Sequence, residues 1–389
     1  MKKLLGILVL GIGIVLTIPN CTIAATINNC EQTITTNPED TANQYRCQTG
    51  NTFTVNKNKG VSNDSKPLTL STNSAQTVII NNSGTIEATN NGANAIDGAN
   101  SDTVTLTNQS TGEINGKGNG IYVGSGDNWT IDNYGTIYGE AAKAINIRGG
   151  DNHKITNRSK ATIKTDGQNA ILTWKTADGT DPVETITIDN YGNITAAYNA
   201  VKIGGGTTGA TITNYSGGII EATTDNGDDR AAVKIDADDV TVINKGTITA
   251  DGEFSSILIK NNITGTKIYV DEAASFTGEI DLGNNASASD TTLYLECNIS
   301  QDITIEIKKK SLATITNNLC GNDTLTIQDS SGNADAGNSE TDGYLVIDEG
   351  LEVVSYNAKY RSENVSTKLK GLFNAANYIN SGGPEDKFF

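Results

Sequence analysis

The chain has 389 residues, of which 28 are Lys or Arg and 45 are Asp or Glu, so its formal net charge is -17 at pH 7. This excess of acid opposes binding to nucleic acid or to anionic lipid, and we expect neither as a partner. The length could hold two or three ordinary domains, but aromatic residues make up only 5% of the chain. That profile suits a thin solenoid better than a set of globular cores.

Residues 1–25 are predicted to be a secretory signal peptide. Met1, Lys2 and Lys3 supply a positive start, an apolar run covers residues 4–18, and small residues suitable for cleavage follow at 22–25. A membrane anchor is the alternative, but a run of about 15 residues is short of the roughly 20 that span a bilayer. We therefore expect an exported protein with no transmembrane segment after cleavage. Residues 26–76, which follow the signal peptide, are predicted to form an N-terminal cap.

Residues 77–282 carry an internal repeat. Each copy opens with Ile or Val, places an asparagine two residues later and ends on another isoleucine, as in I-D-N-Y-G-T-I at residues 131–137. The repeated asparagines are Asn82, Asn108, Asn133, Asn157, Asn190, Asn214 and Asn244, at intervals of 24 to 33 residues. Self-similarity at this period predicts a solenoid of stacked coils. The forms N-x-G-x-I and N-x-S-x-G/A-x-I alternate strictly, for which the sequence offers no physical reason.

Each repeat predicts three short strands. Alternating β-branched residues place Ile and Val on one face and Thr, Asn or Lys on the other, so each strand is half buried. The third strand has the pattern small-I-x-I at residues 144–147, 200–203, 232–235 and 256–259. One coil cannot bury its isoleucines alone, so we expect about eight coils to stack in parallel. The predicted fold is all-β, a right-handed parallel β-helix.

The repeated asparagine and glycine have structural interpretations. The asparagines could form a side-chain amide ladder from coil to coil, which we favour, or a row of unconnected turn formers. Neither interpretation makes them catalytic. We expect positive φ at the glycines that follow, because a residue without Cβ reaches that region cheaply. These are Gly84, Gly135, Gly192 and Gly246.

Beyond Leu282 the repeat stops, and residues 283–360 are predicted to be a β-rich C-terminal cap. Alternating segments at 293–295, 303–307, 325–327, 344–347 and 351–354 predict its strands. Residues 361–389 form the predicted tail with a short amphipathic helix. Its apolar face consists of Leu369, Leu372, Phe373, Ala376 and Ile379, at helical spacing.

Four cysteines remain after removal of the signal peptide, all of them outside the repeats. An even number in an exported chain predicts disulfides. Proximity in sequence favours Cys30–Cys47 and Cys297–Cys320 over the two other connectivities, each pair closing a loop at one end of the solenoid. Zinc would require closer spacing.

The signal peptide, the N-x-G-x-I repeats and the β-rich segment together resemble the passenger region of Gram-negative autotransporters and related β-helical adhesins. The resemblance covers roughly residues 77–354. It implies export and then passage through an outer-membrane β-barrel, with display on the cell surface or release. The first interpretation is a passenger whose barrel is encoded separately, as an outer-membrane translocator partner, or has been lost. A free-standing secreted protein and a periplasmic protein are the alternatives. Repeat style identifies architecture well and activity poorly.

A polysaccharide lyase or hydrolase is the competing hypothesis, because such enzymes also use parallel β-helices. Lyases need carboxylates for calcium beside a basic residue, and inverting hydrolases need two carboxylates about 6.5–9.5 Å apart. The best candidates are Asp225, Asp228, Asp229 and Arg230. Acidic residues are also common in loops between strands. We therefore predict no enzymatic activity and no cofactor.

Two further features are weak candidates for a site. Asp127 and Asp151 occupy equivalent turns and could together hold calcium, but the repeat of calcium-binding β-rolls is absent, so we predict no metal site. His153 is the only histidine of the chain. We expect it to be exposed in a turn and without function.

Tyr134, Tyr191 and Tyr215 each follow a repeated asparagine and are predicted to form an outward binding stripe. Neighbouring coils lie about 4.8 Å apart, so a repeating ligand could contact several at once. We therefore predict a non-enzymatic surface or secreted protein that binds a glycan or a cell-surface polymer. A structural surface-layer element that assembles with itself is a third possibility.

Overall fold

A computed structural model of the chain describes residues 26–27, 32–35, 44–48, 50–70, 77–99, 101–175, 179, 181–223, 230–251, 254–283, 291–297, 299–308, 313–320, 323–335 and 342–348. Every regular element in these ranges is a β-strand, so the predicted all-β class is confirmed. The predicted signal peptide, the strand at 351–354 and the tail helix lie outside the described residues.

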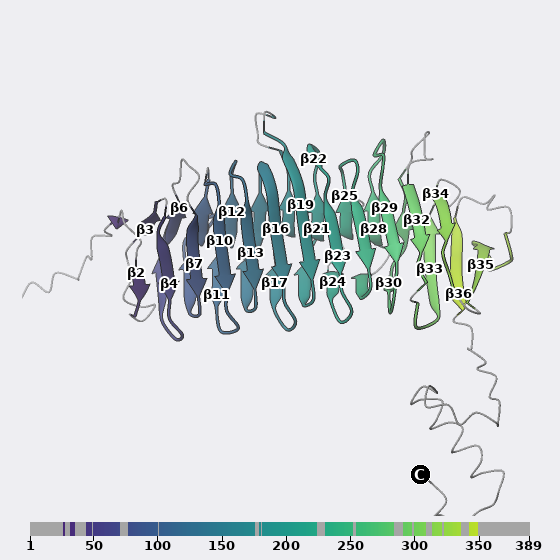
Figure 1. Cartoon of the computed structure of the whole chain (residues 1–389), viewed down its shortest axis with the longest axis horizontal. Helices are drawn as coiled ribbons and strands as arrows, with labels where there is room; N and C mark the ends of the chain where they lie inside the picture. Colours follow the sequence, from purple (N-terminus) through teal and green to yellow (C-terminus); the bar gives the residue numbers. More distant parts are fainter. Residues whose placement is uncertain are drawn as a thin grey trace, which may run out of the picture. The chain divides into compact units, whose positions relative to one another are not determined.

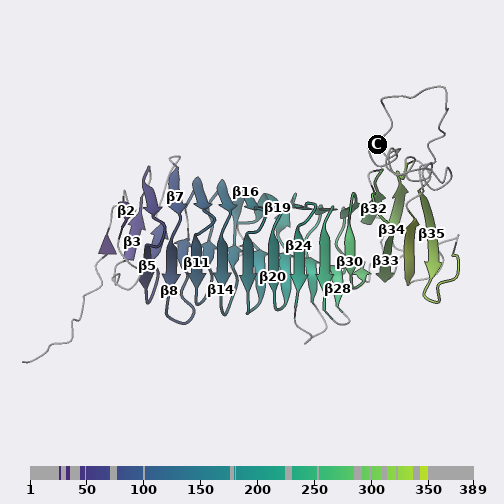
Figure 2. The ribbon, with the colours of Figure 1, turned by 90° about the horizontal axis from the view of Figure 1, so that it is seen from below.

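The strands form three sheets that run side by side along the molecule (Figures 1 and 2). The first sheet contains, in spatial order, β1 (Thr26–Ile27), β3 (Gln44–Cys47), β6 (Leu68–Leu70), β9 (Ile96–Gly98), β12 (Ile121–Val123), β15 (Ile145–Ile147), β18 (Asn169–Thr173), β21 (Asn199–Ile203), β25 (Ala231–Ile235), β28 (Ser255–Ile259), β31 (Ile280–Asp281), β33 (Ile303–Lys308), β36 (Gly343–Asp348) and β35 (Thr324–Asp329).

The second sheet contains β2 (Gln32–Ile34), β4 (Thr52–Val55), β7 (Val78–Asn82), β10 (Val104–Asn108), β13 (Trp129–Asn133), β16 (Gly150–Asn157), β19 (Val183–Asn190), β23 (Thr211–Asn214), β26 (Thr241–Asn244), β29 (Lys267–Val270), β32 (Thr291–Leu295) and β34 (Ala313–Asn317), with β22 (Thr207–Thr208) paired to β19. The third contains β5 (Gly60–Asn63), β8 (Thr85–Ala88), β11 (Glu113–Gly116), β14 (Thr136–Gly139), β17 (Thr162–Thr165), β20 (Asn193–Ala196), β24 (Ile219–Ala222), β27 (Thr247–Ala250) and β30 (Ser275–Thr277).

Each coil passes through the second, the third and then the first sheet, and equivalent strands of successive coils pair in parallel. Leu106, for example, pairs with Ile80 of the preceding coil and with Ile131 of the following one. The result is the predicted parallel β-helix, with about 9 turns. Residues 26–70 supply β1 to β6, which pair in the same three sheets as the repeats that follow.

The core is a narrow apolar column between the three sheets. Inward apolar residues of one coil stack on the residues at the same positions of the next, as Ile131, Ile137 and Ile145 show for the three sheets. All three side chains are 0% exposed. Burying an isoleucine stabilises the fold by about 1.5–3 kcal/mol, so stacking, and not any single coil, holds the solenoid together.

A column of left-handed residues lies at or near the start of the second-sheet strands in successive coils. Its members are Thr103 (φ 53°), Asn128 (58°), Asn152 (58°), Thr185 (55°), Gly209 (63°), Asp239 (56°) and Gly265 (72°). The next residue of each coil is buried, as with Val104, Trp129 and His153. The left-handed residue therefore turns the chain so that the following side chain enters the core. Asn and Asp tolerate this region better than most residues, which explains part of the column's composition.

At the C-terminal end the pairing changes direction. Strand β33 pairs in parallel with β31, but β36 pairs with both β33 and β35 in antiparallel fashion. The disulfide Cys297–Cys320 joins the ends of β32 and β34, which confirms one of the two predicted bridges. Cys47 is also disulfide-bonded. Its predicted partner, Cys30, lies outside the described residues.

Candidate binding surface along the asparagine ladder

The seven repeated asparagines form a continuous hydrogen-bonded ladder. The Nδ2 group of each donates to Oδ1 of the next, through Asn82, Asn108, Asn133, Asn157, Asn190, Asn214 and Asn244, at 2.8, 2.8, 2.9, 2.9, 2.8 and 3.0 Å. All seven side chains are 0% exposed. In the register of the sheet the ladder ends where Val55 and Val270 take the asparagine position. It therefore fixes the turn between the second and third sheets in the middle of the solenoid.

The two forms of the repeat give two turns around the same amide. In the short form, N-x-G-x-I, the side-chain oxygen of the asparagine accepts the N–H two residues later, as Asn133 Oδ1 does from Gly135 at 3.2 Å. In the long form, N-x-S-x-G/A-x-I, a backbone turn replaces that bond, as when Gly112 N–H donates to Gln109 O at 2.7 Å. The ladder amide is satisfied in both, so alternate turn lengths are compatible with one unbroken ladder.

The expectation of positive φ at the short-form glycines is wrong. Gly84, Gly135, Gly192 and Gly246 are not among the described residues with positive φ. A Cβ on Gly135 would instead lie 2.2 Å from Gly112 O and 2.4 Å from Gln109 O of the preceding coil. The other three glycines have backbone oxygens equally close. Glycine is needed here because two backbones approach each other closely, and the left-handed positions lie elsewhere in the coil.

Each ladder asparagine is followed by an outward side chain, and four of these in consecutive coils form what we call the tyrosine–arginine column. Its members are Tyr134, Arg158, Tyr191 and Tyr215. Their backbone N–H groups donate to the backbone oxygen of the preceding coil's ladder asparagine at 2.7, 2.8, 2.7 and 2.8 Å. The buried ladder therefore sets the spacing of the exposed column.

The rings and the guanidinium of the column contact one another. Tyr191 and Tyr215 stack with centroids 4.0 Å apart and an interplanar angle of 8°. The guanidinium carbon of Arg158 lies 5.4 Å from the Tyr134 centroid. The hydrogen bond with Tyr191, burial and Asp189 raise the pKa of Tyr215 to about 12, so the Tyr215 phenol keeps its proton at neutral pH. Tyr134 is 40% exposed at the end of the column.

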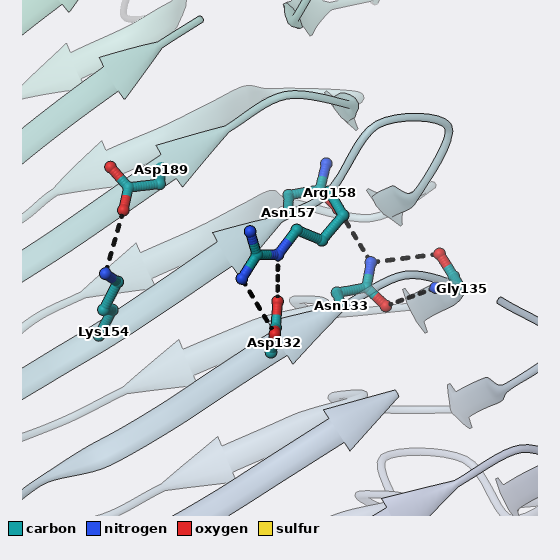
Figure 3. Close-up of polar contacts among 7 residues, drawn as sticks. All are labelled: Asp132, Asn133, Gly135, Lys154, Asn157, Arg158 and Asp189. Carbon is teal, nitrogen blue, oxygen red and sulfur yellow. Dashed lines mark hydrogen bonds and ion pairs between the residues drawn. The ribbon is translucent and has the colours of Figure 1, made fainter. Parts of the chain in front are cut away.

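Acidic and basic side chains of the second sheet form ion pairs beside Arg158 of the column (Figure 3). Arg158 reaches back to Asp132 of the preceding coil, with Nε to Oδ1 at 2.6 Å and Nη2 to Oδ2 at 3.1 Å. Lys154 Nζ lies 3.5 Å from Asp189 Oδ2 of the following coil. Bidentate pairing holds the guanidinium in place, so its face stays beside the tyrosines. The surface combines aromatic faces with hydrogen-bonding groups, the chemistry that recognises sugar rings and polar polymers.

The expected exposure of His153 is wrong. Asn152 has positive φ, which turns His153 into the core between Trp129 and Ile186, and its side chain is only 2% exposed. A ring nitrogen contacts Gly149 O at 3.1 Å, and burial lowers the pKa of the imidazole below 6.5. His153 is therefore a core residue that is neutral in the folded protein.

We predict that acidification destabilises the fold through His153. The unfolded chain takes up the imidazole proton near pH 6.5, above the folded-state pKa. The free energy of unfolding should therefore fall as the pH drops below about 6.5, by at most about 1.4 kcal/mol per pH unit, until the folded-state pKa is reached. Urea unfolding of the wild type and of His153→Gln, measured above and below that pH, checks this. Carboxylates titrate in both proteins, so an identical pH dependence would contradict the role of His153.

Asp127 and Asp151 connect neighbouring coils. Asp127 Oδ1 accepts the N–H of Asp151 at 2.8 Å, and Asp102 Oδ1 accepts the N–H of Asp127 at 3.0 Å. The carboxylates thus accept backbone N–H groups across the turn. In the part of the chain that the structure describes, no group of three or more His, Cys, Asp or Glu side chains is placed to hold a metal ion.

Asp225, Asp228 and Asp229 lie outside the described residues. Arg230 is described, and its guanidinium carbon stacks 3.6 Å from the ring centroid of Tyr198. Its Nη1 atom is buried and has no hydrogen-bond partner. The absence of enzymatic activity therefore stays a prediction, with the lyase or hydrolase as its alternative.

Two further pairs of hydrogen-bonded asparagine amides were not predicted. Asn119 Nδ2 donates to Asn94 Oδ1 at 2.8 Å, and Asn199 Nδ2 donates to Asn169 Oδ1 at 2.8 Å, both near the start of first-sheet strands. These asparagines are not part of an N-x-G motif, and other residues occupy the equivalent positions in the remaining coils. Only the three-dimensional register brings them together.

Among the residues with a described structure we find no helix with the length and apolarity that a bilayer crossing requires. Comparisons with protein families, with curated proteins and with solved structures found no match to this chain.

Proposed function

We propose that this chain is an exported β-helical protein of autotransporter-passenger or adhesin type that binds a glycan or another surface polymer through its outer face. The observation that carries the proposal is the tyrosine–arginine column. Three aromatic rings and one guanidinium stand in consecutive coils at a spacing set by the buried ladder. A ligand with its own short repeat can meet the same kind of contact at several coils.

The binding mechanism follows from this repetition. A single exposed aromatic contact contributes about 0.5–1.5 kcal/mol, which alone gives no useful affinity. Linked contacts on one chain act at high effective concentration once the first is made. Because the column is stacked and ion-paired before any ligand arrives, little side-chain entropy remains to be lost on binding.

Export is supported by the residues at the start of the chain and by the cysteines. The positive and apolar segments of residues 1–18 have the order of a signal peptide. The bridge Cys297–Cys320 persists best in an oxidising compartment. Cell-surface display through a separate translocator and release as a free protein are both compatible with these features.

We predict that Tyr191→Ala combined with Tyr215→Ala weakens binding to a polysaccharide by about tenfold, because two stacked rings are lost. The probes are immobilised mannan, chitosan, polygalacturonate and heparin, with binding measured by biolayer interferometry. The expected result is saturable binding of the wild type to at least one of them, with affinity that rises with chain length.

The matched control is the double substitution Tyr269→Ala and Tyr294→Ala. These tyrosines also stack on the outer face of the second sheet, at 4.4 Å and 8°, but outside the column. Binding to none of the probes, or equal losses for the two double variants, would refute the assignment to the column.

The enzymatic alternative is separated by incubating the protein with the same polysaccharides and assaying for new reducing ends or unsaturated products. Turnover abolished by Asp228→Ala or Asp229→Ala would replace the binding proposal with a lyase or hydrolase. Self-assembly without ligand, seen by light scattering, would instead favour a structural surface layer.

A further inference from the structure

A hollow of about 340 Å³ lies on the outer face of the third sheet, over β8, β11, β14 and β17. It arises from unequal side chains in one outward column of that sheet. In the pairing register, Glu87, Asn115, Tyr138 and Lys164 occupy the same position in successive coils. Asn115 is shorter than the residues on either side, so space is left above it. The volume falls within the range of small-molecule pockets.

The walls of the hollow differ in chemistry. Asn115 forms the floor, Glu87 stands at the side of the preceding coil, and the Tyr138 ring stands at the side of the following coil. Glu113 and Thr136 line one flank. On the opposite flank Lys117 forms an ion pair with Glu140.

Contacts with the following coil hold Tyr138 in place. Its hydroxyl donates to Asp166 at 2.6 Å, and Lys164 Nζ lies 5.0 Å from its ring centroid. Burial and the bond to Asp166 raise the pKa of Tyr138, so the phenol stays protonated. Lys164 belongs to the following coil, whereas the floor residue Asn115 belongs to the preceding one, so the other ring face is available to the hollow.

The charges of the lining residues are unequal. Lys117 is paired with Glu140, and Lys164 contacts the Tyr138 ring. Glu87 accepts a hydrogen bond from Ser62 at 3.4 Å, and Glu113 accepts one from Asn115 at 3.4 Å. Neither carboxylate has a cationic partner within the described part of the chain. The lining residues comprise three carboxylates and two ammonium groups, a net charge of -1. The hollow therefore offers two carboxylates without an ion pair beside an aromatic face.

We propose that this hollow binds one pyranose unit of an amino-sugar chain, with Glu87 and Glu113 accepting from the protonated amine and Tyr138 packing against the apolar ring face. The proposal deepens, and rests on, the glycan-binding function proposed above. An aromatic wall suits the C–H face of a sugar, whereas Asn115 and Thr136 can exchange hydrogen bonds with its hydroxyls. The carboxylates of Glu87 and Glu113, which have no ion pair, select an ammonium group and disfavour a uronic acid.

The test is calorimetric titration of the full chain with three hexasaccharides: β-1,4-linked glucosamine, its fully N-acetylated form and galacturonate, at mildly acidic pH and low salt. We expect glucosamine to bind at least about tenfold more tightly than the acetylated form, and galacturonate to bind most weakly. The double variant Glu87→Gln, Glu113→Gln should remove that preference. Asn115→Tyr, which fills the hollow without changing its charge, should abolish binding there.

Glu221→Gln and Thr249→Tyr are matched controls, because both residues lie in the same outward column of the third sheet but do not line the hollow. They should leave the affinity for glucosamine hexamer unchanged. Equal affinity for the acetylated hexamer, or unaltered binding by Asn115→Tyr, overturns the site. If tyrosine-column variants still weaken polysaccharide binding in that case, only this site fails. If no saccharide binds the wild type, both proposals fail.

Discussion

Replacing Asn133 by aspartate should cost about 3–5 kcal/mol of unfolding free energy at neutral pH, although the two side chains have nearly the same shape. Asn133 Nδ2 donates to Asn157 Oδ1 at 2.9 Å and to Gly135 O and Thr162 O at 3.2 Å each. In the variant these three oxygens would face a carboxylate at a site that is 0% exposed. An unpaired buried charge is therefore created in the middle of the ladder.

The pH dependence of Asn133→Asp provides an independent check. Burial and the facing oxygens should raise the folded-state pKa of the new carboxyl above its unfolded value. The folded state then binds the proton more tightly, so the variant should regain stability relative to the wild type as the pH falls through that pKa. Urea unfolding followed by circular dichroism at several pH values measures this recovery.

Asn193→Asp is the matched control for the ladder. It introduces the same charge at an exposed position two coils further along the solenoid. Exposed substitutions usually change stability by less than about 0.5 kcal/mol. Comparable losses in the two variants would mean that overall charge, and not the ladder, explains the effect. Loss of two-state behaviour in Asn133→Asp alone would indicate that the solenoid separates into two blocks of coils.

The sequence predicted the fold because the solenoid repeats one local rule many times. The alternation of Ile131, Asn133 and Ile137 specifies both the buried face and the turn, and every further coil repeats it. If the strands of one coil are misassigned, the other coils still predict the same fold. The ladder followed from the same logic, since identical polar residues at identical positions must meet when the coils stack.

Features that depend on backbone conformation could not be predicted in the same way. Asn152 lies near the start of β16 and Gly135 in the turn after β13, and Asn152 adopts positive φ whereas Gly135 does not. Neither residue type reveals which constraint applies, because asparagine also forms caps and glycine also permits close approach. The positive φ of Asn152 explains why the expectation for His153 is wrong, since a left-handed residue directs the next side chain into the core instead of solvent.

The hollow could not be found from sequence because its walls come from different coils. Glu87, Asn115 and Tyr138 are separated by more than 20 residues each, and the alternate turn lengths change that separation from coil to coil. If the coils paired in a different register, residues other than Glu87 and Tyr138 would lie beside Asn115. The tyrosines next to the ladder were easier to find, because their position relative to an asparagine is fixed in every repeat.

Gly135→Ala should cost about 3 kcal/mol, the second largest loss that we expect. The new Cβ would lie 2.2 Å from Gly112 O and 2.4 Å from Gln109 O, and neither backbone oxygen can move without shifting the neighbouring coil. Gly92→Ala is the control: Gly92 has φ of 78° but nothing within 4 Å of an added Cβ. It should cost only about 1–2 kcal/mol, the penalty for a left-handed residue with a side chain.

Comparing the two glycine variants by urea unfolding decides which constraint selects glycine in the repeat. A greater loss for Gly92→Ala would mean that backbone dihedral angles matter more than the approach of two coils. Gly135 also lies between Tyr134 and Thr136, which lines the hollow. If the coils separate to admit the methyl group, binding of polysaccharide should weaken together with stability, because the ladder that holds the fold also positions the outer surface.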